Sequence, residues 1–293
     1  GVDDALARLP FLFRDWFGEP FADNSAVPAS LGWELAAARG GVPESAPRQG
    51  RPPVAVSGNG ADTIFGGSRA ARKLDARGRW LGWLDQPARW TGWPPLAALS
   101  MTRASARDRM TAFPGPVAAY LTGFWPALPT FNQIWTETSH RRPSRRAMST
   151  GSLVWLPNST LAKDEALARA TGVDTITPFC DPEVVAFAGR LPDPLTDRKL
   201  LLKELARDVV PPALLARSKG TFSIPTWTWL GGPLEELLLD LVTPERLRSL
   251  RIRRFGPVRY LLARRHSLRV GDARQLWILL TLALWSLTEP SLP

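Results

Sequence analysis

A short apolar run that ends in a glycine-rich turn limits what this chain can fold into more than any other stretch. Residues 53–67 read PVAVSGNGADTIFGG, and the run Val54–Val56 stops at Ser57 and Gly58. Such a run closed by glycines is typical of a buried parallel strand, and glycines let the backbone approach a ligand closely. Ligands of open α/β sheets bind beyond the carboxyl ends of strands. The stretch therefore predicts a nucleotide or phosphate site over residues 57–62, although a glycine-rich turn without a ligand remains the alternative.

Most of the remaining chain follows the helical period. Apolar residues recur at helical spacing over residues 3–17, where Pro10 predicts a kink or a break. Asp23 and Ser25 are helix-capping residue types, and they predict a second helix that begins at about Ser25 or Pro28 and ends at Arg39. Because a lone strand cannot form a sheet, we expect the missing strands upstream of Gly1, in a longer parent chain. The predicted fold class is α/β, with a partial parallel sheet and a long, mostly helical C-terminal region. Further helices are predicted over residues 70–83, 161–171, 182–190, 199–210, 233–242, 257–266 and 273–287.

Charge and composition narrow the classes of partner. The net charge of +10 attracts anions such as nucleotides. The basic residues are mostly scattered arginines, without a helix-turn-helix, zinc-finger or RNA-binding signature, so no nucleic-acid partner is predicted. The single cysteine, Cys180, rules out an internal disulfide and suits a reducing compartment. The longest apolar run, residues 276–287, is shorter than the roughly 20 residues that a membrane span needs. We expect a cytoplasmic protein without a membrane partner.

Several separated blocks resemble, in order, the synthetase domain of glutamine-hydrolysing asparagine synthetases. Residues 18–28, GEPFADNSAVP, resemble the pattern D-E-P-x-x-D-x-S-x-x-P, and residues 57–67 resemble S-G-D/E-G-A/S-D-E-x-F-G-G. Residues 161–181 resemble L-x-K-x-D followed by L-E-x-R-x-P-F-L-D. DRKLLLKEL around Lys199, SKGTFSIPTWTWL from residue 218 and LWILLTLALW at 276–285 resemble the later blocks. The resemblance spans nearly the whole chain.

This resemblance implies an ATP-pyrophosphatase-type fold, in which a parallel sheet precedes a helical C-terminal part. It also implies an ATP-dependent carbon–nitrogen ligase that works in two steps with Mg²⁺. ATP first activates a carboxylate, either aspartate or an Asp or Glu side chain, as an acyl-adenylate and releases pyrophosphate. Ammonia or an amine then attacks the acyl carbon. Metal and lysine charges would offset the charge of the leaving pyrophosphate.

The family's functional residues carry over to matched positions of this chain. Asp62 would act in catalysis as the Mg²⁺ ligand, since a carboxylate oxygen suits that ion, and Lys199 would be the catalytic cation. From the residues alone, Asp62 could instead cap a helix, Lys199 could be a surface lysine, and the Lys-Gly pair at 219–220 could be a helix-terminating turn. The residues implied in ATP binding are Ser57, Gly58, Asn59, Gly60, Lys219 and Gly220.

The chain departs from the family pattern at positions that matter for the chemistry. Asn59 replaces an acidic residue proposed to accept a proton during ammonia attack, and an amide cannot be a general base at neutral pH. Other departures are Thr63 for a Glu, Ile176 for an Arg, and Lys163 with Glu165 for the K-x-D pair. The chain contains neither the S-G-G-x-D-S loop nor the cysteine amidotransferase domain of the family. A glutaminase domain or another ammonia source is therefore expected outside it.

These departures leave three further interpretations open. The spacing of Lys219, Gly220 and Phe222 resembles that of lasso-peptide macrolactam synthetases, which close a peptide carboxylate onto the peptide's own N-terminus. β-Lactam synthetases share the first step, and a non-catalytic remnant of the domain is the third possibility. We interpret the chain as one truncated synthetase-type domain. It would comprise a nucleotide-binding remnant at 1–75, a variable Trp/Arg-rich segment at 76–150 and a helical part at 151–293.

Overall fold

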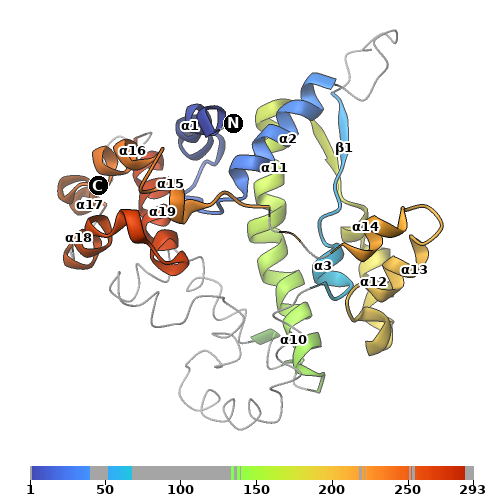
Figure 1. The fold of residues 1–293 in the computed structure, drawn as a ribbon. Helices are drawn as coiled ribbons and strands as arrows, with labels where there is room; N and C mark the ends of the chain where they lie inside the picture. The colour runs from blue at the N-terminus through green and yellow to red at the C-terminus, as the bar shows by residue number, and fades with distance from the viewer. Residues whose placement is uncertain are drawn as a thin grey trace.

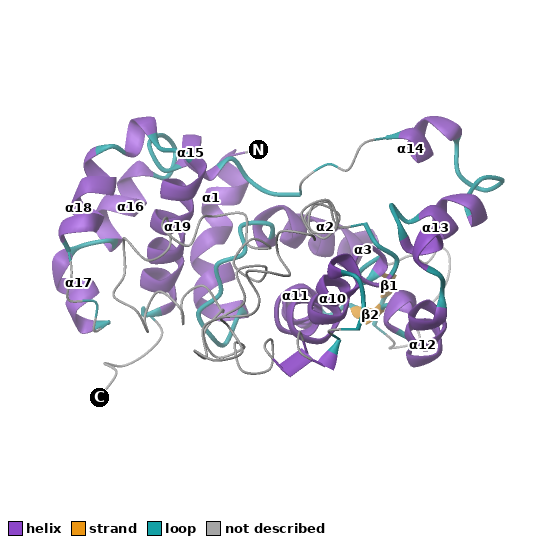
Figure 2. Cartoon of the chain, turned by 90° about the horizontal axis from the view of Figure 1, so that it is seen from below, coloured by secondary structure: helices purple, strands orange, loops and turns teal. Residues whose placement is uncertain are grey.

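The computed structural model describes residues 2–39, 52–67, 133–134, 137–138, 140–217, 220, 222–250, 252 and 255–287 (Figure 1). Helices dominate these residues, and the two short strands form one parallel sheet. Figures 1 and 2 both show α15–α19 gathered at one end of the molecule and the strands with α3, α12 and α13 at the other. The helix predicted at 70–83 and most of the Trp/Arg-rich segment lie outside the described residues.

The first helical group combines the beginning and the end of the chain. α1 (Val2–Pro10) passes directly into the π-helical turn η1 (Phe11–Trp16), so the predicted irregularity at Pro10 is confirmed. η1 packs against α19 (Val270–Trp285). The helices α15 (Thr226–Trp229), α16 (Glu235–Leu241) and α18 (Gly256–Ala263) also pack against α19. The same group contains α17 (Pro244–Ser249) and the 3-10 turn η5 (Arg265–Ser267), which packs against α15.

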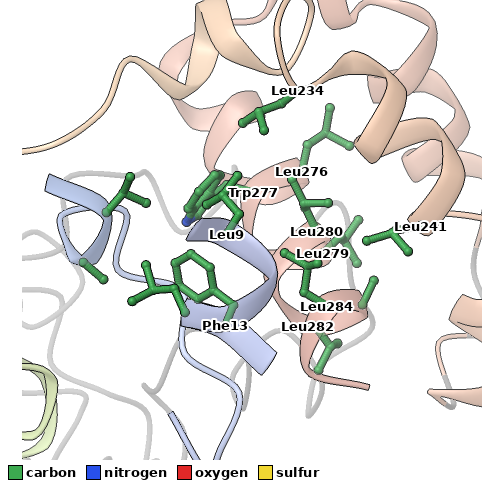
Figure 3. Packing of buried hydrophobic residues seen from close by; sticks show 14 of the residues in the cluster. Leu9, Phe13, Leu234, Leu241, Leu276, Trp277, Leu279, Leu280, Leu282 and Leu284 are labelled. Atoms are coloured by element: carbon green, nitrogen blue, oxygen red, sulfur yellow. The ribbon is translucent and has the colours of Figure 1, made fainter. Parts of the chain in front are cut away.

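α19 is the central helix of this group, since Ala273 and every residue from Gln275 to Leu284 are buried. From Leu276 to Leu284 every residue except Thr281 is apolar, which is typical of a fully buried helical segment. Trp277 lies at its centre, edge-on to the Phe13 ring at a centroid distance of 5.5 Å (Figure 3). The Trp277 indole N–H donates to the Ala22 carbonyl oxygen at 3.0 Å, so its polar atom is satisfied inside the core.

The second group surrounds the two strands, β1 (Val54–Val56) and β2 (Asp174–Ile176). α2 (Ala26–Arg39) precedes β1, and α3 (Ala61–Ile64) follows it. α10 (Pro143–Thr150), the π-helical η2 (Gly151–Leu161) and α11 (Ala162–Thr171) form one continuous rod, in which α11 packs against α2 (Figure 1). After β2 come η3 (Pro178–Cys180), α12 (Pro182–Arg190), η4 (Asp193–Thr196), α13 (Leu200–Leu205) and α14 (Pro212–Ala216).

The partner of β1 lies within this chain, so the prediction that its neighbours must all precede Gly1 is wrong. β1 and β2 are parallel, with Val54 opposite Asp174 and Val56 opposite Ile176. α11 ends at Gly172, whose φ of +67° lets the chain reverse and run directly into β2. The sequence pattern did not reveal β2 because it has only three residues and contains Asp174, which is a poor strand former.

The prediction that β1 is buried is also wrong for the described residues. The Val54 and Val56 side chains are 55% and 72% exposed, and Ile176 beside them is 53% exposed. All three residues of β2 are exposed as well, whereas Ala55 in the middle of β1 is partly buried and packs against the main core. The findings fit an α/β class in which helices predominate, with a small parallel sheet.

Most of the predicted helices that fall within the described residues are present. α12 begins after Asp181, whose side chain accepts a hydrogen bond from the Glu183 N–H at 2.8 Å, and Pro182 occupies its first turn. The predicted helix over 199–210 is shorter than expected. It ends at Leu205, and turns follow to residue 209.

Candidate nucleotide-binding site

The loop after β1 begins where the sheet ends. The Ser57 N–H still donates to the Ile176 carbonyl oxygen of β2 at 2.8 Å, and the Asn59 N–H then turns back to the Ser57 Oγ at 3.3 Å. Gly60 has a φ of +90°, and a Cβ there would lie 2.9 Å from the Cys180 Sγ. Glycine is therefore required at this turn. Packing does not require Gly58, since an added Cβ would meet no described atom within 4 Å.

Asp62 and Lys199 meet immediately beyond this loop. Asp62 lies in the first turn of α3, whose N-cap is Gly60, so its side chain is not the cap of that helix. Its Oδ1 forms an ion pair with the Lys199 Nζ, and each of the two side chains is 35% exposed. Lys199 is the N-cap residue of α13. The two residues carried over as catalytic, from distant parts of the chain, are thus in direct contact.

The Gly66–Gly67 pair explains how Lys199 reaches Asp62. The Lys199 N–H donates to the Phe65 carbonyl and the Arg198 N–H to the Gly66 carbonyl, both at 3.1 Å. A Cβ at Gly66 would overlap the Thr196 carbonyl, and one at Gly67 would lie 2.6 Å from the Lys199 Cε. The two glycines therefore allow the segment before α13 to lie directly on α3.

The backbone at this contact adopts an uncommon conformation. Arg198 and Lys199 both have positive φ, +53° and +56°, and they are the non-glycine residues with positive φ in the described parts of the chain. Such residues carry a cost of about 1–3 kcal/mol each and tend to occur at functional sites. The hydrogen bonds to Phe65 and Gly66 hold this turn in place.

A second polar contact joins the block at 18–28 to α11. Lys163 is buried, and its Nζ donates to the Ser25 Oγ at 2.6 Å and to the Asp23 Oδ2 at 3.1 Å. Asp23 also accepts the Ser25 N–H at 3.0 Å. Buried lysines are nearly always paired, and here the pair connects the chain before α2 with the rod that packs on it. These residues belong to matched blocks, but the sequence pattern predicted no role for them in binding or catalysis.

Asp164, the neighbour of Lys163, was also missed as a site residue. Its Oδ2 accepts the Asn59 side-chain amide and, at 3.4 Å, the Ser57 hydroxyl. Burial raises the pKa of the Asp164 carboxyl above its ordinary value, although Lys163 and hydrogen bonds from Asn59, Ser57 and Trp33 oppose the shift.

Glu165, the residue matched to the K-x-D aspartate, lies elsewhere. It is exposed and pairs with Arg169 one turn along the surface, at 2.9 Å. The helical phase of α11 directs Asp164, and not Glu165, at the loop after β1. The sequence did carry one signal for this: a second carboxylate directly beside the matched lysine.

The structure gives little support for a role of Lys219 and Gly220, the last two residues that the sequence implied in ATP binding. Lys219 lies outside the described residues. Gly220 lies in the connection between α14 and α15, and a Cβ there would meet no described atom within 4 Å. Packing within the described chain therefore does not require a glycine at this position.

The carboxylate of Asp62 could hold Mg²⁺ only if a bound nucleotide supplied further oxygen ligands. Among the residues that the structure describes, no group of three or more His, Cys, Asp or Glu side chains is arranged to hold a metal. Mg²⁺ commonly takes one or two carboxylates and completes its shell with water and substrate phosphates. Asp62 supplies one such carboxylate at the edge of the loop, where its present partner is the Lys199 ammonium group.

The sequence model of the family described as asparagine synthase matches residues 1–287 of this chain. The chain belongs to the asparagine synthase family. The family predicted from the separated sequence blocks is thereby confirmed. Asparagine synthase family members are ATP-dependent amide ligases, which supports the coarse class of the predicted chemistry.

The curated relatives share low sequence identity with this chain. A Mycobacterium bovis protein provisionally named asparagine synthetase (glutamine-hydrolyzing) is 27% identical over 307 residues, which cover 97% of this chain and 45% of that protein. The same values hold for the relative from Mycobacterium tuberculosis H37Rv. Asparagine synthetase (glutamine-hydrolyzing) 1 of Bacillus subtilis is 24% identical over 135 residues, covering 45% of this chain and 21% of that protein. The chain thus spans about half the length of the mycobacterial relatives. No solved structure matches it.

Within the described residues, no helix is both long enough and apolar enough to cross a membrane.

Proposed function

We propose that the protein is an ATP-dependent amide-forming ligase, which activates a carboxylate as an acyl-adenylate and transfers the acyl group to ammonia or an amine. The observation that carries this proposal is the contact between Asp62 and Lys199, next to the loop over 57–60. A carboxylate and an ammonium group at the carboxyl end of a strand suit a bound triphosphate. Family membership and the relatives support the same class of reaction.

In the first step, one carboxylate oxygen of the substrate attacks the α-phosphorus of ATP, and pyrophosphate leaves with the bonding electron pair. Lys199 would turn from Asp62 to the phosphoryl oxygens and offset the negative charge that develops there. Asp62, released from the lysine, would hold Mg²⁺ against the phosphates. That ion would supply charge neutralisation for the leaving pyrophosphate.

The loop would position the nucleotide. The turn at Gly60 would bring the backbone close to the nucleotide, and the Ser57 hydroxyl at the end of β1 would face the same loop. The Gly66–Gly67 contact would keep Lys199 within reach of the same site. Positioning of this kind supplies much of the rate enhancement in reactions between two bound substrates.

The carboxylate substrate is either aspartate or an acidic side chain of a peptide. A free amino acid would make the enzyme an asparagine synthetase, whereas a peptide would make it a macrolactam synthetase. Asn59, in place of the family's acidic residue, is the observation that keeps the peptide in consideration. The two are separated by the carboxylate that supports ATP–pyrophosphate exchange.

The test is ATP–pyrophosphate exchange in the protein made from its complete reading frame, with aspartate as the added carboxylate. Lys199→Met should reduce exchange by about 10²–10³-fold, the usual loss when one charge-stabilising donor is removed. Lys203→Met is the matched control, since this exposed lysine lies one turn further along the same segment. Equal exchange in Lys199→Met and wild type would contradict the role of Lys199. Exchange with an acidic peptide but not with aspartate would identify the macrolactam reaction.

A further inference from the structure

The amide-forming step needs a proton acceptor, and Asn59 cannot provide one. When ammonia or an amine attacks the acyl-adenylate, the attacking nitrogen becomes positively charged and must lose a proton. A side-chain amide is not a base at neutral pH. A carboxylate nevertheless lies at this position in the structure, because Asp164 accepts the Asn59 amide N–H. The carboxylate that the block at 57–67 lacks at position 59 is therefore replaced in space by one from α11.

The groups around Asp164 leave it suited to this role. The Ser57 hydroxyl and the Asn59 amide contact it from the loop after β1, and the Trp33 side chain contacts it from α2. Lys163, the neighbour of Asp164 on α11, donates its hydrogen bonds to Asp23 and Ser25. Burial raises the pKa of the Asp164 carboxyl above its ordinary value, which makes the ionised carboxylate a stronger base.

We propose that Asp164 is the proton acceptor of the amide-forming step and that Asn59 orients it. This inference rests on the proposed function. The nitrogen lone pair forms the new C–N bond, and the carbonyl electron pair moves to the acyl oxygen. Asp164 takes one proton from that nitrogen. The acyl oxygen then re-forms its double bond, the C–O bond to the phosphate breaks, and AMP leaves with the bonding electrons. Asp164 passes its proton to water.

The experiment measures the two steps separately in the full chain. ATP–pyrophosphate exchange with aspartate reports adenylation, and asparagine formation with ammonium chloride reports the whole reaction. Asp164→Asn should leave exchange close to wild type and should lower asparagine formation by about 10²–10⁴-fold, the usual contribution of a general base. Glu165→Gln is the matched control. It removes the neighbouring carboxylate, which pairs with Arg169 on the surface, and should leave both rates unchanged.

A rescue variant distinguishes a base from a structural carboxylate. Asn59→Asp combined with Asp164→Asn moves the carboxylate across the same hydrogen bond, so it should recover a large part of asparagine formation. The pH profile is the second readout, since the rise in rate with pH that reports deprotonation of Asp164 should disappear in Asp164→Asn. If Asp164→Asn unfolds, Asp164→Ser takes its place in the same assays.

The outcomes are separable. Asparagine formation at the wild-type rate in Asp164→Asn would overturn the inference. A parallel loss of both rates in a folded variant, without recovery in the double variant, would also overturn it, because Asp164 would then have a structural role. Absence of exchange in the wild type with aspartate and with acidic peptides would instead overturn the proposed function itself.

Discussion

The core around α19 and the site around α3 are built on different principles. The core buries leucines, Phe13 and Trp277 from both ends of the chain, and its elements meet through apolar surface. The site has a much smaller apolar cluster, around Ile64 and Phe65. It depends on a few polar contacts and on glycines that allow close approach. The difference implies that changes in the core should alter stability, whereas changes in the site should alter chemistry.

The largest effect on stability is expected at Trp277. Trp277→Ala would remove a large, 2%-exposed side chain from the centre of the core. The free energy of unfolding should fall by about 3–5 kcal/mol, through lost burial and the cavity left behind. Equilibrium unfolding in denaturant measures this change in the free energy of unfolding. Trp155→Ala, at a tryptophan that is 62% exposed, is the control and should change stability little. Equal effects of the two substitutions would mean that α19 is not the centre of the core.

Gly66→Ala is expected to act mainly on the site. The added Cβ would overlap the Thr196 carbonyl and push the segment that carries Lys199 away from Asp62. A misplacement of about 1 Å can cost 10²-fold in rate, so ATP–pyrophosphate exchange should fall by about 10–100-fold.

Gly189→Ala serves as the control for that substitution. Gly189 lies in α12, and an added Cβ there would meet no described atom within 4 Å. Alanine favours the helix at this position, so exchange should be unchanged and stability should rise slightly. Full exchange in Gly66→Ala would show that the turn before α13 can be displaced without moving Lys199.

The same contrast explains how much could be predicted from the sequence. α12 and α18 follow from apolar periodicity, because an amphipathic helix can be recognised from local spacing alone. The predicted site loop does follow β1, but β2 and Asp164 were missed. Their positions depend on contacts between residues far apart in the chain, such as Asn59 with Asp164. The predicted burial of β1 failed because the strand pattern cannot tell which faces of a sheet are covered.

A smaller effect is expected in the pH dependence of stability. The folded protein holds the Asp164 proton more tightly than the unfolded chain, since burial raises the folded pKa above the ordinary value of 3.8. Its contribution to stability is therefore largest below that value and is lost as the pH rises through the folded pKa. Asp164→Asn removes this dependence, so Tm of the variant minus Tm of the wild type should be larger at neutral than at acidic pH. A difference that stays constant, or that shrinks toward neutral pH, would mean that burial does not raise the pKa of Asp164 in the folded protein.

The central claim is that Asp62 and Lys199 form the adenylation site. The most direct test is ATP–pyrophosphate exchange in Asp62→Asn, measured beside the wild type in the protein made from its complete reading frame. The account predicts that exchange is abolished while Tm stays close to the wild-type value, since Asp62 is partly exposed and lies outside the core. Full exchange in a folded Asp62→Asn protein would contradict the assignment of the site.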